Sequence, residues 1–287
     1  MGDRSVDAPF AMSRGGAVSL GEFLADVDAT AGCLPNRRWV FNVCADRYRF
    51  TVGFAAALVR GQVSLLPPIR TPDFLVRLAA DYPGTYCLAD DDLSADPFDV
   101  VRLELDQQRP ARDGAMPSFA ADQIAAISFT SGTTGRPTPH VKRWGPLAAG
   151  AVAEAAALGL DRLARPSLVG TVPPQHMYGF ESTVLLALHG GCLLSAERPF
   201  YPLDVRAALQ RVAAPRVLVT TPVHLRALVL AGVELPPLAL VLCATAPLAD
   251  DLARAAEQRF GAPTREIYGF TEDRKSTRLN SSHSSVS

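Results

Sequence analysis

Short apolar runs and longer stretches rich in Ala and Leu alternate along most of this chain. The short runs predict strands over 39–44, 62–66, 85–89, 124–130, 167–172, 191–195, 216–220, 238–243 and 264–268. The longer stretches predict helices over 20–33, 49–60, 72–80, 146–159, 180–189, 203–213, 222–231 and 248–260. A strand that is repeatedly followed by a helix is typical of βα units, so we expect an α/β fold with mainly parallel sheets.

Changes in composition along the chain predict its division into lobes. The segment 90–118 is rich in Asp, Arg and Pro, and we expect it to link an N-terminal α/β lobe, residues 1–115, to a second α/β lobe, residues 116–272. Residues 273–287 are rich in Ser and have no aromatic residue and no helical or strand period. They are interpreted either as a flexible tail or as non-native sequence joined where the true chain continues, and on both interpretations they contribute nothing to the fold.

Composition narrows the classes of function. The 287 residues are 48% apolar, which supports a proper core, and the net charge of −1 provides no basic field for nucleic acid or an anionic membrane. The five cysteines show no metal-binding spacing, so we expect reduced thiols and a cytoplasmic protein. We expect neither a signal peptide nor a membrane span, because no apolar stretch is long and uninterrupted enough.

The candidate chemistry begins where the apolar run Ile124 to Phe129 enters a loop of small residues. Glycines allow main-chain N–H groups to converge on an anion, and hydroxyl groups add neutral donors. This pattern predicts a phosphate-binding loop formed by Thr130, Ser131, Gly132, Thr133, Thr134 and Gly135. The alternative is an ordinary surface turn. Arg136 and Pro137 follow Gly135, so the loop lacks the lysine that defines the common P-loop and its phosphotransferases.

Three further motifs follow in order along the chain. Residues 173–180 contain His176 beside small and aromatic residues, residues 243–248 form a turn after an apolar run, and residues 268–272 read Tyr-Gly-Phe-Thr-Glu. Each alone also fits an ordinary structural role, such as a core histidine or a strand-to-helix connection. An aromatic ring can stack on a purine, glycine permits close backbone approach, and a carboxylate is suited to Mg²⁺.

Together these four motifs resemble the adenylate-forming, or AMP-binding, superfamily of acyl-CoA synthetases, peptide-synthetase adenylation domains and luciferases. The resemblance implies the N-terminal large-domain portion of such an enzyme. It implies that the loop holds the β and γ phosphates of ATP, that Thr271 contacts the α phosphate, and that Glu272 binds Mg²⁺. It also places Tyr268 and Gly269 at the adenine beside Ala244, Thr245 and Ala246, and places His176 and Phe180 on the route to the acyl pocket. Thr271, Glu272 and His176 are therefore the expected catalytic residues.

The implied reaction activates a carboxylic acid, fatty or aromatic, as an acyl-adenylate and transfers it to the thiol of CoA or of a phosphopantetheine arm on an acyl carrier protein. The sequence departs from the family at Thr138, where relatives usually carry lysine, and Lys142 is the nearest replacement. The dipeptide Pro139-His140 and the compact N-terminal lobe are similar to acyl ligases of aryl-polyene or xanthomonadin-type pigment clusters. His140 itself matches no motif and is expected to be structural or on the surface.

The family's downstream aspartate for the ribose, its hinge and its lysine-bearing C-terminal domain are not found after Glu272. We therefore expect a C-terminally truncated fragment that is catalytically incompetent, although its parent is an adenylating ligase. The alternative is a non-catalytic nucleotide-binding module.

Overall fold

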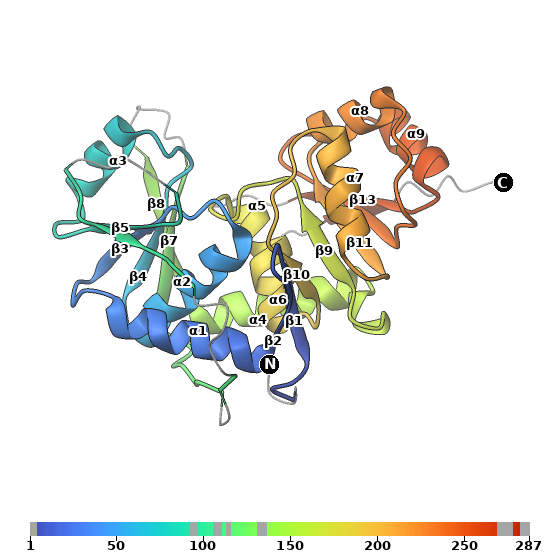
Figure 1. Cartoon of the computed structure of the whole chain (residues 1–287). Helices are drawn as coiled ribbons and strands as arrows, with labels where there is room; N and C mark the ends of the chain where they lie inside the picture. The colour runs from blue at the N-terminus through green and yellow to red at the C-terminus, as the bar shows by residue number, and fades with distance from the viewer. Residues whose placement is uncertain are drawn as a thin grey trace.

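The computed structural model describes residues 5–91, 97–105, 111–112, 116–130, 137–268 and 278–281. Its strands form two sheets (Figure 1), which confirms the α/β fold with mainly parallel sheets. The six-stranded sheet has the order β6 (Val100–Arg102), β5 (Tyr86–Ala89), β3 (Trp39–Asn42), β4 (Val63–Leu66), β7 (Ile124–Thr130) and β8 (Thr138–Arg143). All neighbouring strands in it are parallel except β7 and β8.

The second sheet contains eight described strands. Its order is β14 (Arg278–Ser281), β13 (Thr264–Tyr268), β12 (Leu240–Cys243), β11 (Arg216–Thr220), β9 (Ser167–Gly170), β10 (Leu193–Ser195), β1 (Pro9–Ser13) and β2 (Gly16–Ser19). The six strands from β13 to β1 run parallel to their neighbours, whereas β14 and β2 pair antiparallel at the two edges.

Helices lie on both sides of the sheets. Figure 1 shows α3 beside the six-stranded sheet, α7 to α9 beside the eight-stranded sheet, and α4 and α6 in the region between them. The helices are α1 (Leu20–Cys33), α2 (Arg47–Val59), α3 (Pro72–Ala79), α4 (Trp144–Ala157), α5 (Met177–Gly179), α6 (Leu186–His189), α7 (Pro202–Arg211), α8 (Pro222–Ala231) and α9 (Asp250–Phe260). A 3₁₀ turn spans Leu160–Arg162, and a π-helical segment, Phe180–Leu185, joins α5 to α6.

The predicted strands and helices are all present with small changes at their ends, but five strands were not predicted. These are β1, β2, β6, β8 and β14. Strand β8 is Thr-Pro-His-Val-Lys-Arg with mostly exposed side chains, so it has no apolar run by which it could be recognised. Backbone pairing with a neighbouring strand, rather than burial, holds such a segment at the edge of a sheet.

Part of residues 273–287, for which no contribution to the fold was expected, lies in a strand. Residues Arg278–Ser281 form β14, which pairs antiparallel with β13 in the register Ile267 to Leu279. The main chain can pair without any apolar periodicity, and for that reason the sequence pattern did not reveal the strand. The non-native origin of residues 273–287 stays a prediction.

The sheets do not divide at residue 115, the predicted lobe boundary. Strands β7 and β8 follow that residue but belong to the six-stranded sheet, whereas β1 and β2 precede it and lie in the eight-stranded sheet. The buried core also crosses between the sheets, because Phe54 of α2 contacts Phe180 with ring centroids 4.9 Å apart. The boundary at 115, as a division into folding units, stays a prediction.

Candidate functional site

The predicted site residues that the structure describes lie at the carboxyl ends of parallel strands. Thr130 is the last residue of β7, Ala244 follows β12, and Tyr268 is the last residue of β13. His176 follows β9 after a short turn. Ligands of open α/β sheets bind outside the carboxyl ends of the strands, so these positions suit a binding site. The remaining predicted residues lie outside the described residues: Ser131, Gly132, Thr133, Thr134, Gly135, Gly269, Thr271 and Glu272.

His140 is a neighbour of the predicted phosphate loop that the sequence analysis missed. Antiparallel pairing sets Thr130 opposite Thr138 and Ser128 opposite His140. The Thr130 hydroxyl and the His140 Nε2 atom are 3.1 Å apart, within hydrogen-bonding distance. No motif contains His140, and only the register of β7 against β8 could have indicated it. An imidazole therefore lies next to the first residue of the loop in a chain that has Thr138 where relatives usually carry lysine.

The motif at 173–180 is a tight turn that opens a helix. A Cβ atom on Gly179 would lie 2.1 Å from the Pro173 carbonyl oxygen, so only glycine fits this close approach. His176 caps the helix, because its Nδ1 atom accepts a hydrogen bond from the Tyr178 N–H at 3.3 Å. The π-helical segment begins at Phe180, and such segments occur frequently at functional sites.

His176 keeps an exposed side chain, although neighbouring atoms remove part of the hydration of its ring and lower its pKa below the usual value. The ring is therefore neutral at pH 7. A neutral imidazole can accept or donate a hydrogen bond at the site without carrying charge.

Tyr178 connects this motif to the predicted adenine turn. Its ring is buried, and its hydroxyl donates a hydrogen bond of 2.9 Å to the carbonyl oxygen of Leu242 in β12. Burial raises the pKa of the Tyr178 hydroxyl well above its usual value, so it stays protonated and acts as a donor. Two motifs that are distant in the sequence are thus joined through the end of β12.

The predicted adenine turn, residues 243–248, carries backbone strain. Thr245 has a φ of +85°, in the region that favours glycine, and it is a β-branched residue for which such an angle is a genuine outlier. Strain of this kind costs on the order of 1–3 kcal/mol and clusters at active sites and ligand clamps. Ala244 is buried, whereas Thr245 and Ala246 are exposed at the strand end. The Leu248 N–H donates to the Glu266 carboxylate at 2.8 Å, which holds the turn against β13.

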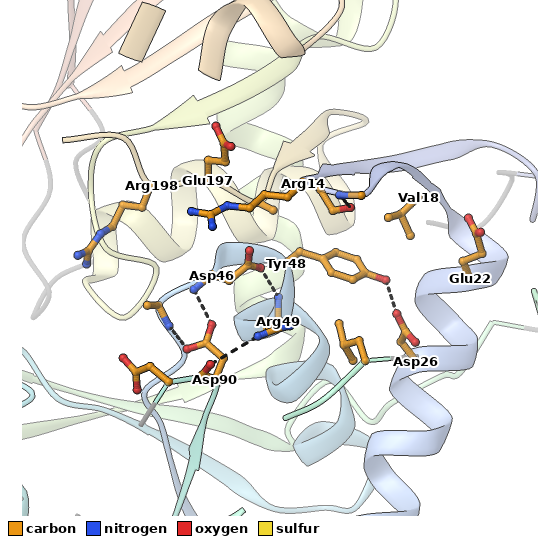
Figure 2. Close-up of a pocket in the computed structure, with 16 residues that line it drawn as sticks. Arg14, Val18, Glu22, Asp26, Asp46, Tyr48, Arg49, Asp90, Glu197 and Arg198 are labelled. Carbon is orange, nitrogen blue, oxygen red and sulfur yellow. Dashed lines mark hydrogen bonds between the residues drawn. The ribbon is translucent and has the colours of Figure 1, made fainter. Parts of the chain in front are cut away.

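A separate cavity of about 480 Å³ lies near the first turn of α2, between the β1–β2 turn and the end of β5 (Figure 2). None of the predicted site residues lines it. Its carboxylates are already engaged: Asp90 accepts the N–H groups of Ala45 and Asp46 at 2.7 Å each, and Asp26 accepts the Tyr48 hydroxyl at 2.7 Å. Asp46 caps α2 by accepting the Arg49 N–H at 2.9 Å. The positive end of α2 is therefore occupied by the protein's own carboxylates.

Among the described residues, no group of three or more His, Cys, Asp or Glu side chains is arranged to hold a metal ion. The described part of the chain also contains no helix that is both long and apolar enough to cross a membrane.

Residues 53–276 match the family described as AMP-binding enzyme. The chain belongs to this family, as its four motifs predicted. No curated protein matches the chain.

Solved structures of CoA ligases share the fold. One is o-succinylbenzoate-CoA synthetase from Bacillus subtilis in complex with AMP, with a TM-score of 0.77, 17% identity, and coverage of 95% of this chain and 58% of that one. Another is ATP-bound MatB from Rhodopseudomonas palustris, with a TM-score of 0.74, 20% identity, and coverage of 93% and 58%. A malonyl-CoA ligase with methylmalonyl-CoA and AMP bound has a TM-score of 0.70, 22% identity, and coverage of 93% and 58%. The chain thus spans little more than half the length of these structures.

Proposed function

We propose that the protein activates a carboxylic acid with ATP, forming an acyl-adenylate and pyrophosphate, and then transfers the acyl group to a thiol. The observation that carries this proposal is the placement of the described motif residues. Thr130, Ala244, Thr245 and Tyr268 all lie at the carboxyl ends of strands, where nucleotides bind in open α/β folds. Family membership and the fold shared with ATP-bound and AMP-bound CoA ligases support it.

In this proposal the protein mainly positions the reactants and stabilises charge. The loop from Thr130 to Gly135 holds the β and γ phosphates, and His140 orients the Thr130 hydroxyl at its base. The turn at Thr245 lies along the adenine, with Tyr268 stacked on it and Gly269 permitting close approach. Thr271 contacts the α phosphate.

His176 lines the route of the acid, and Phe180 supports it from the buried core between the sheets. The neutral His176 ring provides a hydrogen-bonding group at the mouth of that route. Mg²⁺ would neutralise phosphate charge, and Glu272 would hold it. The acceptor is CoA or the phosphopantetheine arm of an acyl carrier protein, and the acid is fatty or aromatic.

The complete reaction is proposed for the whole protein, because the chain spans about 58% of the related structures. For the 287-residue chain alone we propose ATP binding with negligible adenylate formation, because its motifs account for the nucleotide and no residue matches the family's catalytic lysine. A cytoplasmic location stays a prediction.

The experiment is ATP binding by isothermal titration calorimetry on the wild-type chain and on a Gly132→Val, Gly135→Val double variant. Valine at these positions restricts the backbone and blocks the approach of phosphate, so binding should be lost while the far-UV circular dichroism spectrum is unchanged. Gly32→Val, at an exposed and open position of α1, leaves both glycines of the loop intact and serves as the matched control. Unchanged ATP affinity in a folded double variant would refute the proposal.

A further inference from the structure

A buried arginine links the two sheets at their carboxyl ends. Arg47 is the first residue of α2, a helix that packs against β3 and β4 of the six-stranded sheet. Its side chain is fully buried and points to the eight-stranded sheet. Its four terminal N–H groups reach four main-chain carbonyls, with Nη1 at 3.4 Å from Ser195 and 2.6 Å from Glu197, and Nη2 at 3.0 Å from Gly170 and 2.7 Å from Val172.

This contact requires the shape of arginine. Ser195 and Glu197 lie at the end of β10, and Gly170 and Val172 lie at the end of β9, so the guanidinium ties two strand ends to α2. None of the ion pairs among the described residues includes Arg47. Burial lowers its pKa to about 10, which still leaves the group charged at pH 7. A lysine ammonium is a point charge with three donors and cannot reproduce the planar fork.

Glycine at position 170 makes room for the guanidinium. A Cβ atom on Gly170 would lie 2.7 Å from Arg47 Nη2. The main chain supports the same junction, because the Arg47 N–H donates to the Ala196 carbonyl oxygen at 2.8 Å. The position of α2 is therefore set by β9 and β10 as well as by its own sheet.

The turn that follows β9 has a second anchor near the start of α2. The Gln175 amide, in a buried side chain, donates at 2.5 Å to the carbonyl oxygen of Cys44, just before α2. Within the same turn, the His176 N–H donates to the Pro173 carbonyl oxygen at 3.2 Å. Val172 is thus held by Arg47 of α2, and Gln175 is held by Cys44 just before α2. His176 directly follows Gln175 in the same turn.

We propose that Arg47 is a positioning residue for His176: by holding Val172 and the ends of β9 and β10, it aligns the turn that carries this histidine. It touches no reacting group itself. The contacts of Arg47 do not depend on which reaction the protein catalyses, whereas the effect of Arg47 on acid binding rests on the proposed function.

The test is hydrogen exchange measured by mass spectrometry on the 287-residue chain and on two variants, Arg47→Lys and Arg60→Lys. Arg60 directly follows the last residue of the same helix and has an exposed side chain, so the second variant controls for the substitution. We expect exchange of the His176 and Tyr178 amides to become about tenfold faster in Arg47→Lys, and exchange in β11 to stay unchanged, because opening is local. Uniform acceleration throughout the chain, or unchanged exchange at His176, would overturn the inference.

If Arg47→Lys does not fold, Gly170→Ala displaces the guanidinium, because its Cβ would lie 2.7 Å from Arg47 Nη2. Faster exchange at His176 is expected there too, and its absence would overturn the inference. ATP binding by the wild-type chain is measured separately. A wild type that does not bind ATP refutes the proposed function and leaves the exchange result standing, whereas ATP binding together with unchanged exchange refutes only the role of Arg47.

Discussion

Glu154 on α4 is a partly buried carboxyl group that should make stability depend on pH. Its Oε1 atom accepts a hydrogen bond of 2.6 Å from the Ser182 hydroxyl in the π-helical segment. Loss of hydration raises the pKa of Glu154 to about 7, with the charge of Glu181 adding to the increase and the Ser182 bond opposing it. At pH 8 the folded protein therefore holds an ionised carboxylate that has lost much of its hydration.

The direction and size of the effect follow from the pKa. The folded-state pKa of Glu154 is above its value of 4.5 in an unfolded chain, so its contribution to stability is fully present below pH 4.5. That contribution is lost as the pH rises to about 7. At about 1.4 kcal/mol per pKa unit, the difference between 4.5 and about 7 corresponds to a total loss of roughly 3.5 kcal/mol.

The perturbation is Glu154→Gln, which keeps the shape and removes the titration. Urea unfolding at pH 5 and pH 8 should show a small difference from wild type at pH 5 and a free energy of unfolding that is higher in the variant, by up to roughly 3.5 kcal/mol, at pH 8. Glu234→Gln, at an exposed position, is the matched control and should change little at either pH. If the stability curves of Glu154→Gln and wild type run parallel across this range, the reasoning is refuted.

Three further substitutions test the site. Thr245→Gly should raise the free energy of unfolding by about 1 kcal/mol in urea titrations, because relief of the strained φ of +85° exceeds the entropy cost of glycine. A lower free energy of unfolding in this variant would show that the backbone at Thr245 is not strained. Gly179→Ala should destabilise by about 2 kcal/mol or more, since its Cβ would lie 2.1 Å from the Pro173 oxygen, and an unchanged melting temperature would be inconsistent with this packing. His140→Leu should weaken ATP binding about fivefold by calorimetry by removing the partner of Thr130, with Val141→Leu as control; equal affinities would exclude a role for the imidazole.

Local pattern was enough to predict most elements and the family. Buried strands such as 124–130 are continuous apolar runs, because both faces of a parallel sheet are covered, and this signature does not depend on which strands are neighbours. The motif of residues 268–272 was recognised for a similar reason, since its residue types are consecutive. Family membership followed from the order of such motifs, and the match over residues 53–276 confirmed it.

Contacts between distant residues were decided only by the tertiary structure. The sequence shows Arg47 as one charged residue beside Asp46, and nothing local indicates that four carbonyls from β9 and β10 surround it. The contact between Thr130 and His140 depends on the register of two strands. The left-handed backbone of Thr245 opposes the local preference of a β-branched residue. The carbonyls around Arg47 belong to residues at least 123 positions away along the chain, and the contact of Thr130 with His140 depends on strand pairing, so neither is present in a local pattern.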